Sequence, residues 1–228
     1  MIGRKTILVA TLGAAAIVAG SSAAFGQTCV GTPAGIGQFA LHADLGFTDG
    51  ARSWGGTLSL NLSSPLAFSA GYARTDFDDV DPSQNAFNGT AAFKLAASLP
   101  VEVCPVAGIG YSTLVDESTF FGEKIRTEYT SLSVPIGISV GHRVALRNGV
   151  EILPYAFPHA LHIRSRVVES DPIGAFETSD SRTEFATTLG ASVAFRSVFV
   201  RGSALVTTID ESDPTLSISL GLLLPNGR

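Results

Sequence analysis

The segment from Leu132 to Val140 alternates between bulky apolar residues and small ones. Its even positions read Leu, Val, Ile, Ile and Val, and its odd positions read Ser, Pro, Gly and Ser. Because successive side chains of a β-strand point to opposite faces, this period of two predicts a strand with one bulky apolar face and one face of small, uncharged residues. A strand at the surface of a water-soluble sheet would normally carry charged or strongly polar residues on its second face.

The same alternation recurs along the chain and predicts ten β-strands and no helix. The predicted strands cover residues 38–47, 57–63, 66–74, 91–99, 106–113, 132–140, 151–165, 184–195, 198–206 and 215–224. In the seventh of them an apolar stripe, interrupted by His159, is formed by Leu153, Tyr155, Phe157, Leu161 and Ile163. We therefore expect His162 and Arg164 on the opposite, inward face of that strand.

The links between the predicted strands alternate in length. Links from odd to even strands are the long ones and contain most of the 20 acidic residues; they are residues 48–55, 74–86, 115–128, 165–183 and 208–214. Links from even to odd strands are shorter, at residues 63–65, 100–102, 141–149 and 196–197. Because an up-and-down barrel places all links of one kind at one end, we expect one rim with long acidic loops and one with tight turns.

The N-terminus has the layout of a secretory signal peptide. Arg4 and Lys5 precede a short apolar stretch at residues 7–19, and small residues suited to cleavage lie at 22–26. A membrane-anchoring helix is the alternative interpretation of the same stretch. We expect a signal peptide at 1–26, an N-terminal periplasmic segment at 27–35 and a β-barrel domain at 36–228.

Composition narrows the class of protein. Only 15% of the residues are charged, yet after residue 30 no apolar stretch is long enough for a spanning helix. Loss of the predicted signal peptide leaves 13 of the 15 basic residues against 20 acidic ones, which argues against a nucleic-acid partner.

These features predict the fold class. A strand that faces hydrocarbon must pair all its backbone groups, so the sheet has to close. The predicted fold is therefore all-β: a closed antiparallel up-and-down transmembrane β-barrel of about ten strands, with eight possible. The alternative is a secreted β-sandwich or lipocalin-like barrel, in which the greasy face would form the core.

With this plan the chain resembles the small bacterial outer-membrane β-barrel proteins, the opacity-like and OmpX-like families, over residues 36–224. The resemblance implies a bacterial outer-membrane location, with short turns in the periplasm, long loops outside and outer-membrane lipids around the barrel. One departure is the C-terminus, "LGLLLPNGR", which ends at Arg228 where such barrels usually end on an aromatic residue.

Few residues stand out as candidates for chemistry. We expect a polar network inside the lumen, with pairing that stiffens the barrel as one interpretation and a polar pathway or ligand pocket as the other; it comprises His42, Asp44, Lys94, His162, Arg164 and Arg201. Cys29 and Cys104 both fall at the periplasmic end of the predicted barrel, so in an oxidising compartment we expect a disulfide between them. The acidic outer loop contains Asp76, Asp78, Asp79 and Asp81. Their carboxylates are either solvated or serve as oxygen ligands for a calcium ion.

The expected function is a non-catalytic role in envelope structure or surface interaction. We expect a monomer with no cofactor, no bound metal and no catalytic residue, and the sequence does not identify the surface ligand. One alternative is a narrow porin-like channel for small solutes. Another is a lipid-modifying enzyme, for which His162, Ser165 and Glu184 have the residue types of base, nucleophile and orienting acid.

Overall fold

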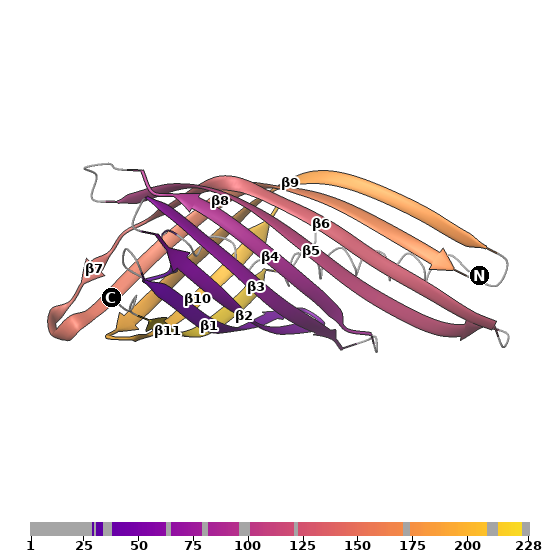
Figure 1. Ribbon diagram of the computed structural model, residues 1–228, viewed down its shortest axis with the longest axis horizontal. Helices are drawn as coiled ribbons and strands as arrows, with labels where there is room; N and C mark the ends of the chain where they lie inside the picture. The colour runs from indigo at the N-terminus through magenta and orange to yellow at the C-terminus, as the bar shows by residue number, and fades with distance from the viewer. Residues whose placement is uncertain are drawn as a thin grey trace.

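Backbone pairing closes the strands into a ring (Figure 1). The computed structural model describes residues 29, 31–33, 38–62, 65–78, 82–95, 101–120, 123–170, 174–208 and 214–224, so the predicted signal peptide lies outside the described residues. The strands are β1 (Phe39–Thr48), β2 (Ala51–Asn61), β3 (Leu66–Phe77), β4 (Gln84–Phe93), β5 (Glu102–Phe120), β6 (Glu123–Gly141), β7 (Val144–Ala145), β8 (Val150–Ser170), β9 (Ala175–Phe195), β10 (Val198–Thr207) and β11 (Thr215–Leu224).

The predicted ten-stranded antiparallel barrel is confirmed. β1 to β6 pair in chain order, β6 pairs with β8, β8 to β11 pair in order, and β11 returns to β1. The two-residue strand β7 stands outside this ring and pairs with β8, Val144 opposite Ile152. A short 3-10 turn (Arg147–Gly149) joins β7 to β8. Among the described residues, no helix is long and apolar enough to cross a membrane.

Bulky apolar side chains cover the outside of the ring. Phe39 and Leu224, which pair with each other, mark what we call the lower end of the barrel. From there to the upper end, most strands place large hydrophobics outward in alternate positions, among them Leu41, Leu58, Phe68, Ile109, Ile136, Leu189, Val200 and Leu220. Leu220 remains 60% exposed, a degree typical of a side chain meant for lipid and not for a protein core.

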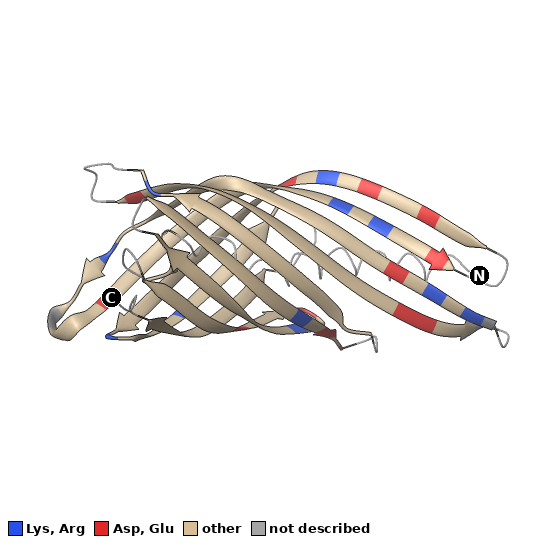
Figure 2. Cartoon of the chain, viewed as in Figure 1, with Lys and Arg blue, Asp and Glu red and all other residues tan. Residues whose placement is uncertain are grey.

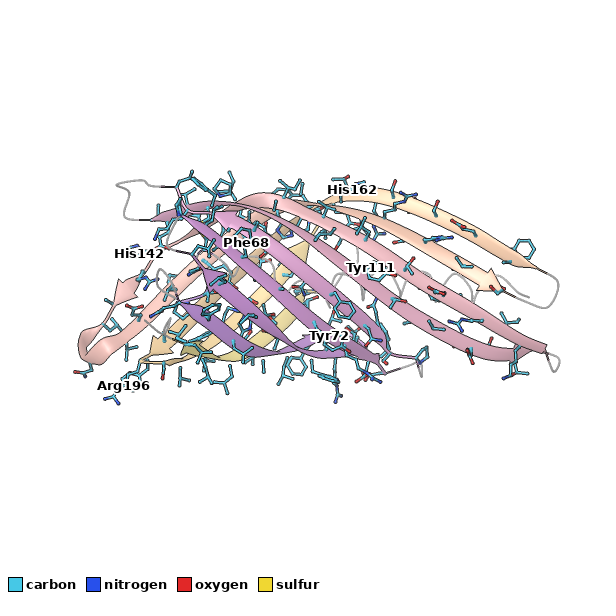
Figure 3. The ribbon with its side chains drawn as sticks, in the orientation of Figure 1. Phe68, Tyr72, Tyr111, His142, His162 and Arg196 are labelled. Atoms are coloured by element: carbon cyan, nitrogen blue, oxygen red, sulfur yellow. A yellow bond between two sulfur atoms is a disulfide. The ribbon has the colours of Figure 1, made fainter. Side chains whose placement is uncertain are left out.

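Aromatic residues mark the upper limit of this apolar belt. Phe47, Trp54, Tyr72 and Phe87 are outward-facing and exposed in the upper halves of β1 to β4, and Tyr111 and Phe185 are outward-facing and exposed midway along the longer strands β5 and β9. Figure 3 labels Tyr72 and Tyr111, together with Phe68, which lies nearer the lower end of the barrel, at the left of that view. Aromatic rings gather at membrane–water interfaces because one part of the ring system favours hydrocarbon and another favours water.

Four strands continue well above the belt. β5, β6, β8 and β9 are 19 to 21 residues long, whereas the other strands of the ring are 10 to 12 residues long. We call the protruding part the extension: residues 115–120 of β5, 123–130 of β6, 164–170 of β8 and 175–184 of β9. Its ladders run to Phe120 opposite Glu123 and to Ser170 opposite Ala175.

The extension corrects the prediction that residues 115–128 and 165–183 are loops. Most of both segments is paired strand, and they stand out in Figure 2 as charged ribbons on one side of the barrel. The position of the fourth strand was also wrong. β4 spans Gln84–Phe93 and not residues 91–99, because its first residues, 84–86, were interpreted as part of the link at 74–86.

The seventh predicted strand, now β8, has its faces reversed. Leu153, Tyr155, Phe157, Leu161 and Ile163 are buried in the lumen and do not face lipid. The outward positions between them are Pro154, Ala156, Pro158 and Ala160, which are apolar enough for a membrane-facing wall. Both faces of this strand suit an apolar environment, so alternation alone could not decide which face is inside.

Candidate functional site

Three of the six residues predicted for the lumen come together on one side of it. The Asp44 carboxylate, on β1, lies 3.0 Å from His42 Nδ1 and accepts a hydrogen bond from Arg201 Nη2 of β10 at 3.1 Å. Thr57 of β2 donates to the other carboxylate oxygen at 3.0 Å, and Ser219 of β11 also donates to Asp44. Four neighbouring strands, β10, β11, β1 and β2, are thereby joined through one carboxylate.

The network is a buried ion-pair cluster. Arg201 is 1% exposed and also donates to Ser219 Oγ at 2.6 Å, so its charge faces Asp44 and a hydroxyl. Buried charges persist only when paired and hydrogen-bonded in this way. The arrangement supports the interpretation that pairing stiffens the barrel.

The other three predicted lumen residues lie elsewhere. Lys94 follows the end of β4 at the lower rim, where it is exposed and donates to Glu102 at 2.8 Å. His162 and Arg164 face outward on β8, as a consequence of the reversed faces of that strand, and Figure 3 shows His162 on the outer surface. Their prediction as lumen residues was therefore wrong.

Large side chains fill the lumen beside the ion-pair cluster. Tyr155 and Phe157 of β8 are buried, and the ring of His159 stacks on Phe157 with centroids 4.4 Å apart. From β10, Phe199 packs edge-on to His42, with centroids 5.8 Å apart. The residues that occupy the lumen thus come largely from β8 and β10.

Glycines on the neighbouring strands make room for these rings, because each one pairs directly with a residue that carries a ring. A Cβ atom at Gly221 of β11 would lie 2.3 Å from ring carbons of Phe199. A Cβ at Gly190 of β9 would lie 2.6 Å from the Tyr155 hydroxyl oxygen. The small inner residues seen in the sequence are therefore complementary to a few bulky side chains of the lumen.

The lower mouth holds part of the N-terminal segment. Cys29 and Cys104 form the predicted disulfide, with Cα atoms 6.1 Å apart. Thr32 is 1% exposed, and Ser192 of β9 donates to the carbonyl oxygen of Gly31. Residues 29 and 31–33 therefore lie inside the mouth of the barrel.

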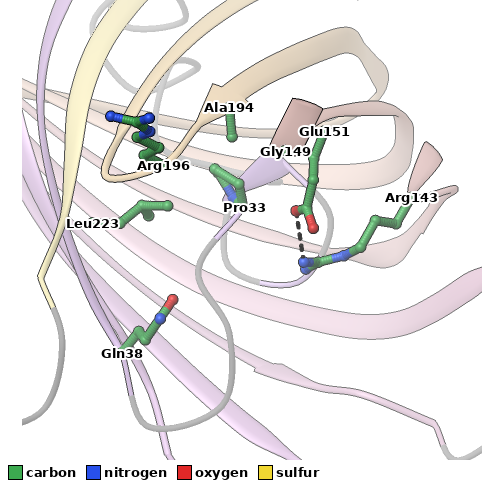
Figure 4. Close-up of a pocket in the computed structure, with 8 residues that line it drawn as sticks. All are labelled: Pro33, Gln38, Arg143, Gly149, Glu151, Ala194, Arg196 and Leu223. Atoms are coloured by element: carbon green, nitrogen blue, oxygen red, sulfur yellow. Dashed lines mark hydrogen bonds and ion pairs between the residues drawn. The ribbon is translucent and has the colours of Figure 1, made fainter. Parts of the chain in front are cut away.

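A cavity of about 260 Å³ remains at this mouth (Figure 4). Its lining combines apolar and charged side chains: Pro33, Gln38, Arg143, Gly149, Glu151, Ala194, Arg196 and Leu223. Arg143 donates to Glu151 at 3.0 Å across one wall, so these two charges satisfy each other. We find no group in the cavity arranged for catalysis.

The two faces of the extension differ in charge. The outward face carries Glu117, Lys124, Arg126, Glu128, Arg164, Arg166 and Glu177, whereas the inward face carries Asp116, Glu169, Asp180, Arg182 and Glu184. Arg166 donates to Glu177 at 2.7 Å, and this contact lowers the pKa of the Glu177 carboxyl. The inward face is thus predominantly acidic and the outward face is mixed.

No protein-family model matches the sequence, and the search of curated proteins finds no relative. Solved structures do resemble the fold. The translocator domain of autotransporter NalP from Neisseria meningitidis matches with a TM-score of 0.50 at 11% identity, over 82% of this chain and 87% of that one. The outer membrane protease OmpT from Escherichia coli matches with a TM-score of 0.47 at 10% identity, over 82% of this chain and 93% of that one. Ail, the attachment invasion locus protein of Yersinia pestis, matches with a TM-score of 0.40 at 14% identity, over 82% of this chain and 96% of that one.

The fold is that of a bacterial outer-membrane β-barrel. This barrel therefore has the architecture that the sequence predicted. Likenesses at such low identity show the fold alone, so neither proteolysis nor attachment follows from them.

The geometry does not assemble the hypothesised hydrolase set. His162 and Ser165 lie three residues apart on β8 and so point to opposite faces of the sheet. Glu184 is on the inward face and pairs with Arg182, at 2.5 Å between Nε and Oε1. His162 Nδ1 instead lies 2.9 Å from the Thr183 hydroxyl. The three residues therefore do not form a base, nucleophile and orienting acid.

The predicted acidic loop is described only in part. Asp76 lies on β3 and pairs with Arg74 at 3.4 Å, and Asp78 is exposed just after the strand. Asp79 and Asp81 lie outside the described residues. In the part of the chain that the structure describes, no group of three or more His, Cys, Asp or Glu side chains could hold a metal ion.

Proposed function

We propose that this chain is a non-conducting outer-membrane barrel that holds the extension outside the membrane as a surface for interaction. The observation that carries the proposal is the continued pairing of β5, β6, β8 and β9 above the aromatic belt, where the other six strands of the ring stop. A barrel needs only about 9–11 residues per strand to cross the membrane. The additional length on four adjacent strands therefore serves something outside the hydrocarbon.

The edges of the extension favour interaction. The ladder between β9 and β10 ends where Thr208 bonds to the Phe185 backbone, so residues 175–184 of β9 form a sheet edge that no described strand pairs. An open edge offers N–H and C=O groups to an extended segment of a partner. Charged side chains along it, among them Glu177 and Asp180, disfavour indiscriminate aggregation.

The filled lumen argues for the non-conducting part of the proposal. Phe157 and Phe199 are 0% and 1% exposed, and the Asp44–Arg201 pair lies beside them. Below them, the disulfide-tethered segment occupies the mouth. Solute passage would require displacement of packed rings and separation of a buried ion pair, both of which are costly.

The test compares the full barrel with a trimmed one. Residues 115–128 and 166–179 would each be replaced by an Asn-Gly turn, which joins Leu114 to Tyr129 and Ser165 to Asp180, two pairs that already lie opposite each other. Both proteins should show heat-modifiable gel mobility, which reports a folded barrel. Cells displaying the full barrel should adhere to one another through this open edge, and cells displaying the trimmed barrel should not.

Two outcomes would count against the proposal. Equal adhesion of full and trimmed barrels, or adhesion by neither, would remove the extension from the role assigned to it. Stepwise conductance of the purified full barrel in planar bilayers would contradict a closed lumen and favour a channel.

A further inference from the structure

Basic residues gather on the outward face just above the apolar belt, against the overall charge of the chain. The protein has a formal net charge of −5. Yet on β2, β3 and β8 the first charged or titratable outward positions above the belt are Arg52, Arg74 and His162, and Arg164 follows His162. Outward acidic residues are either paired, as Asp76 is with Arg74, or stand higher on the extension.

On β8 these residues form a strip of three at alternate positions: His162, Arg164 and Arg166. Just below it, Pro158 and Ala160 belong to the lipid-facing wall. Beside it on β9 stand hydroxyl side chains, with Ser181 opposite Arg164 and Ser179 opposite Arg166. On its other side, Leu132 and Thr130 of β6 lie opposite the same two arginines.

The guanidinium groups of the strip keep donors that are open to a ligand. Arg164 is exposed, and among the described residues its charge acts on Glu177 without a hydrogen bond or ion-pair contact. Arg166 pairs with Glu177, but both side chains are more than half exposed, so a guanidinium N–H remains open to a further acceptor. The strip therefore presents cationic donors beside hydroxyl groups, with the carboxylates of Glu128 and Glu177 on the side away from the apolar belt.

We propose that the strip His162–Arg164–Arg166 binds the phosphate groups of an anionic lipid in the outer leaflet. The guanidinium group matches a phosphate in charge and in its forked donor geometry. Acyl chains of such a lipid would lie along Pro158, Ala160 and the neighbouring Leu132, and its headgroup would meet the strip. The site lies on the outer wall at the base of the extension, next to the lipid-facing residues Pro158 and Ala160, and its test measures lipid binding and not adhesion.

The chain provides a matched control for a test. Lys124 and Arg126 lie on the same outward face with the same charge, but Arg126 pairs with Ser170, six positions beyond Arg164 along β8. Six residues of strand span about 20 Å, which takes the control pair beyond the reach of a headgroup phosphate. The comparison is therefore between R164Q/R166Q and K124Q/R126Q, which lose equal charge.

The experiment measures lipid retained by the full-length barrel in neutral detergent by native mass spectrometry. The probe is lipid A, a diphosphorylated glucosamine lipid, with its dephosphorylated form as the reference. The wild type should retain the phosphorylated probe preferentially. R164Q/R166Q should weaken its binding by about fivefold for each arginine removed, the contribution expected of a basic residue at an anionic membrane surface. K124Q/R126Q should bind as the wild type does.

Salt provides a second measurement that needs no variant. Raising NaCl to 0.5 M should release the phosphorylated probe from the wild type and leave the dephosphorylated one unaffected, because exposed charge pairs are screened. Heat-modifiable mobility verifies that each variant is folded. Equal retention of the two probes, or R164Q/R166Q binding no weaker than K124Q/R126Q, would overturn the proposal.

Discussion

The lower barrel and the extension share four strands but differ in the kinds of side chain on their inward and outward faces. Along β8 in the barrel, every second residue from Leu153 to Ile163 is buried and its outward neighbours are apolar. Higher on the same strand, both faces are polar or half-exposed, with Arg164 and Arg166 on one and Glu169 on the other. The ladder to β9 continues through both parts without a break in register.

The difference shows that the backbone pairing of these strands does not depend on the alternation of their apolar and polar side chains. Backbone hydrogen bonds between neighbours hold the ladder in hydrocarbon and in water alike. The choice of side chains follows the surroundings: lipid outside and a packed lumen inside for the barrel, and water on both faces for the extension. Ion pairs should accordingly matter greatly in the first region and little in the second.

The largest expected effect comes from the buried carboxylate of the barrel. Asp44→Ala removes the acceptor of Arg201 and leaves that guanidinium buried without its counter-charge, which should lower the free energy of unfolding by about 3–5 kcal/mol. Glu177→Ala breaks the exposed pair with Arg166 and should cause no measurable change. Urea unfolding followed by the fluorescence of the single tryptophan, Trp54, measures both.

A double variant separates charge imbalance from lost packing at the same site. Asp44→Asn with Arg201→Met removes both charges together and should recover much of the stability lost in Asp44→Ala. Equal losses for Asp44→Ala and Glu177→Ala would erase the distinction between the two regions.

The next effect concerns the outer surfaces. Leu220 lies midway along the outward face of β11, so Leu220→Arg places a charge near the centre of the hydrocarbon and should cost about 2–4 kcal/mol. Thr119→Arg, which is high on the outward face of the extension and opposite Lys124, should be neutral because that part of the face is in water. The readout is the folded fraction after insertion into phosphatidylcholine vesicles, from gel mobility without heating. A well-tolerated Leu220→Arg would contradict the assignment of this face to lipid.

A smaller effect is expected at the lower mouth. Replacing both Cys29 and Cys104 by Ser removes a cross-link between residues 75 positions apart. We expect a loss of about 2 kcal/mol, at the low end for native disulfides because Cys29 belongs to none of the barrel strands. Reductant should lower the unfolding midpoint of the wild type and leave the double variant unchanged. A wild-type midpoint insensitive to reductant would show that the cross-link does not support the barrel.

The sequence allowed prediction wherever one face of a strand meets hydrocarbon. In β1 and β11, apolar and mild residues alternate clearly, and both the strands and their outward faces were predicted correctly. His42 and Asp44 share the inward face of β1, so their proximity was also predictable. Arg201 was expected to face inward, but its contact with Asp44 depends on the β10–β11–β1 order at the closure of the ring.

Two features could not be predicted from alternation. In the extension both faces meet water, so the contrast between faces disappears and residues 115–128 resemble a loop. In β8 the lumen needs large rings while the lipid side accepts Pro154 and Ala156, so the hydrophobic stripe belongs to the inside. The resulting error also misplaced His162 and Arg164. Each failure has the same cause: period two identifies a strand but does not identify what lies on each side of it.

The smallest expected effect contrasts two carboxylates on β9. Burial raises the pKa of Glu184, at the base of the extension, and outweighs the opposing influence of Arg182, whereas Arg166 lowers the pKa of exposed Glu177. A raised pKa means that the folded state binds the proton more tightly than the unfolded state does. The contribution of Glu184 to stability is therefore greatest below the ordinary carboxyl pKa of about 4.3 and is lost as pH rises through its raised value. The contribution of Glu177 has the opposite sign: it is present above that ordinary value and lost as pH falls. Between pH 7 and pH 4, the unfolding midpoint of the wild type should thus rise relative to Glu184→Gln, whereas the fall relative to Glu177→Gln should be too small to measure because that pair is exposed to water. Parallel pH profiles for the two variants would mean that the base of the extension is as open to water as its upper part.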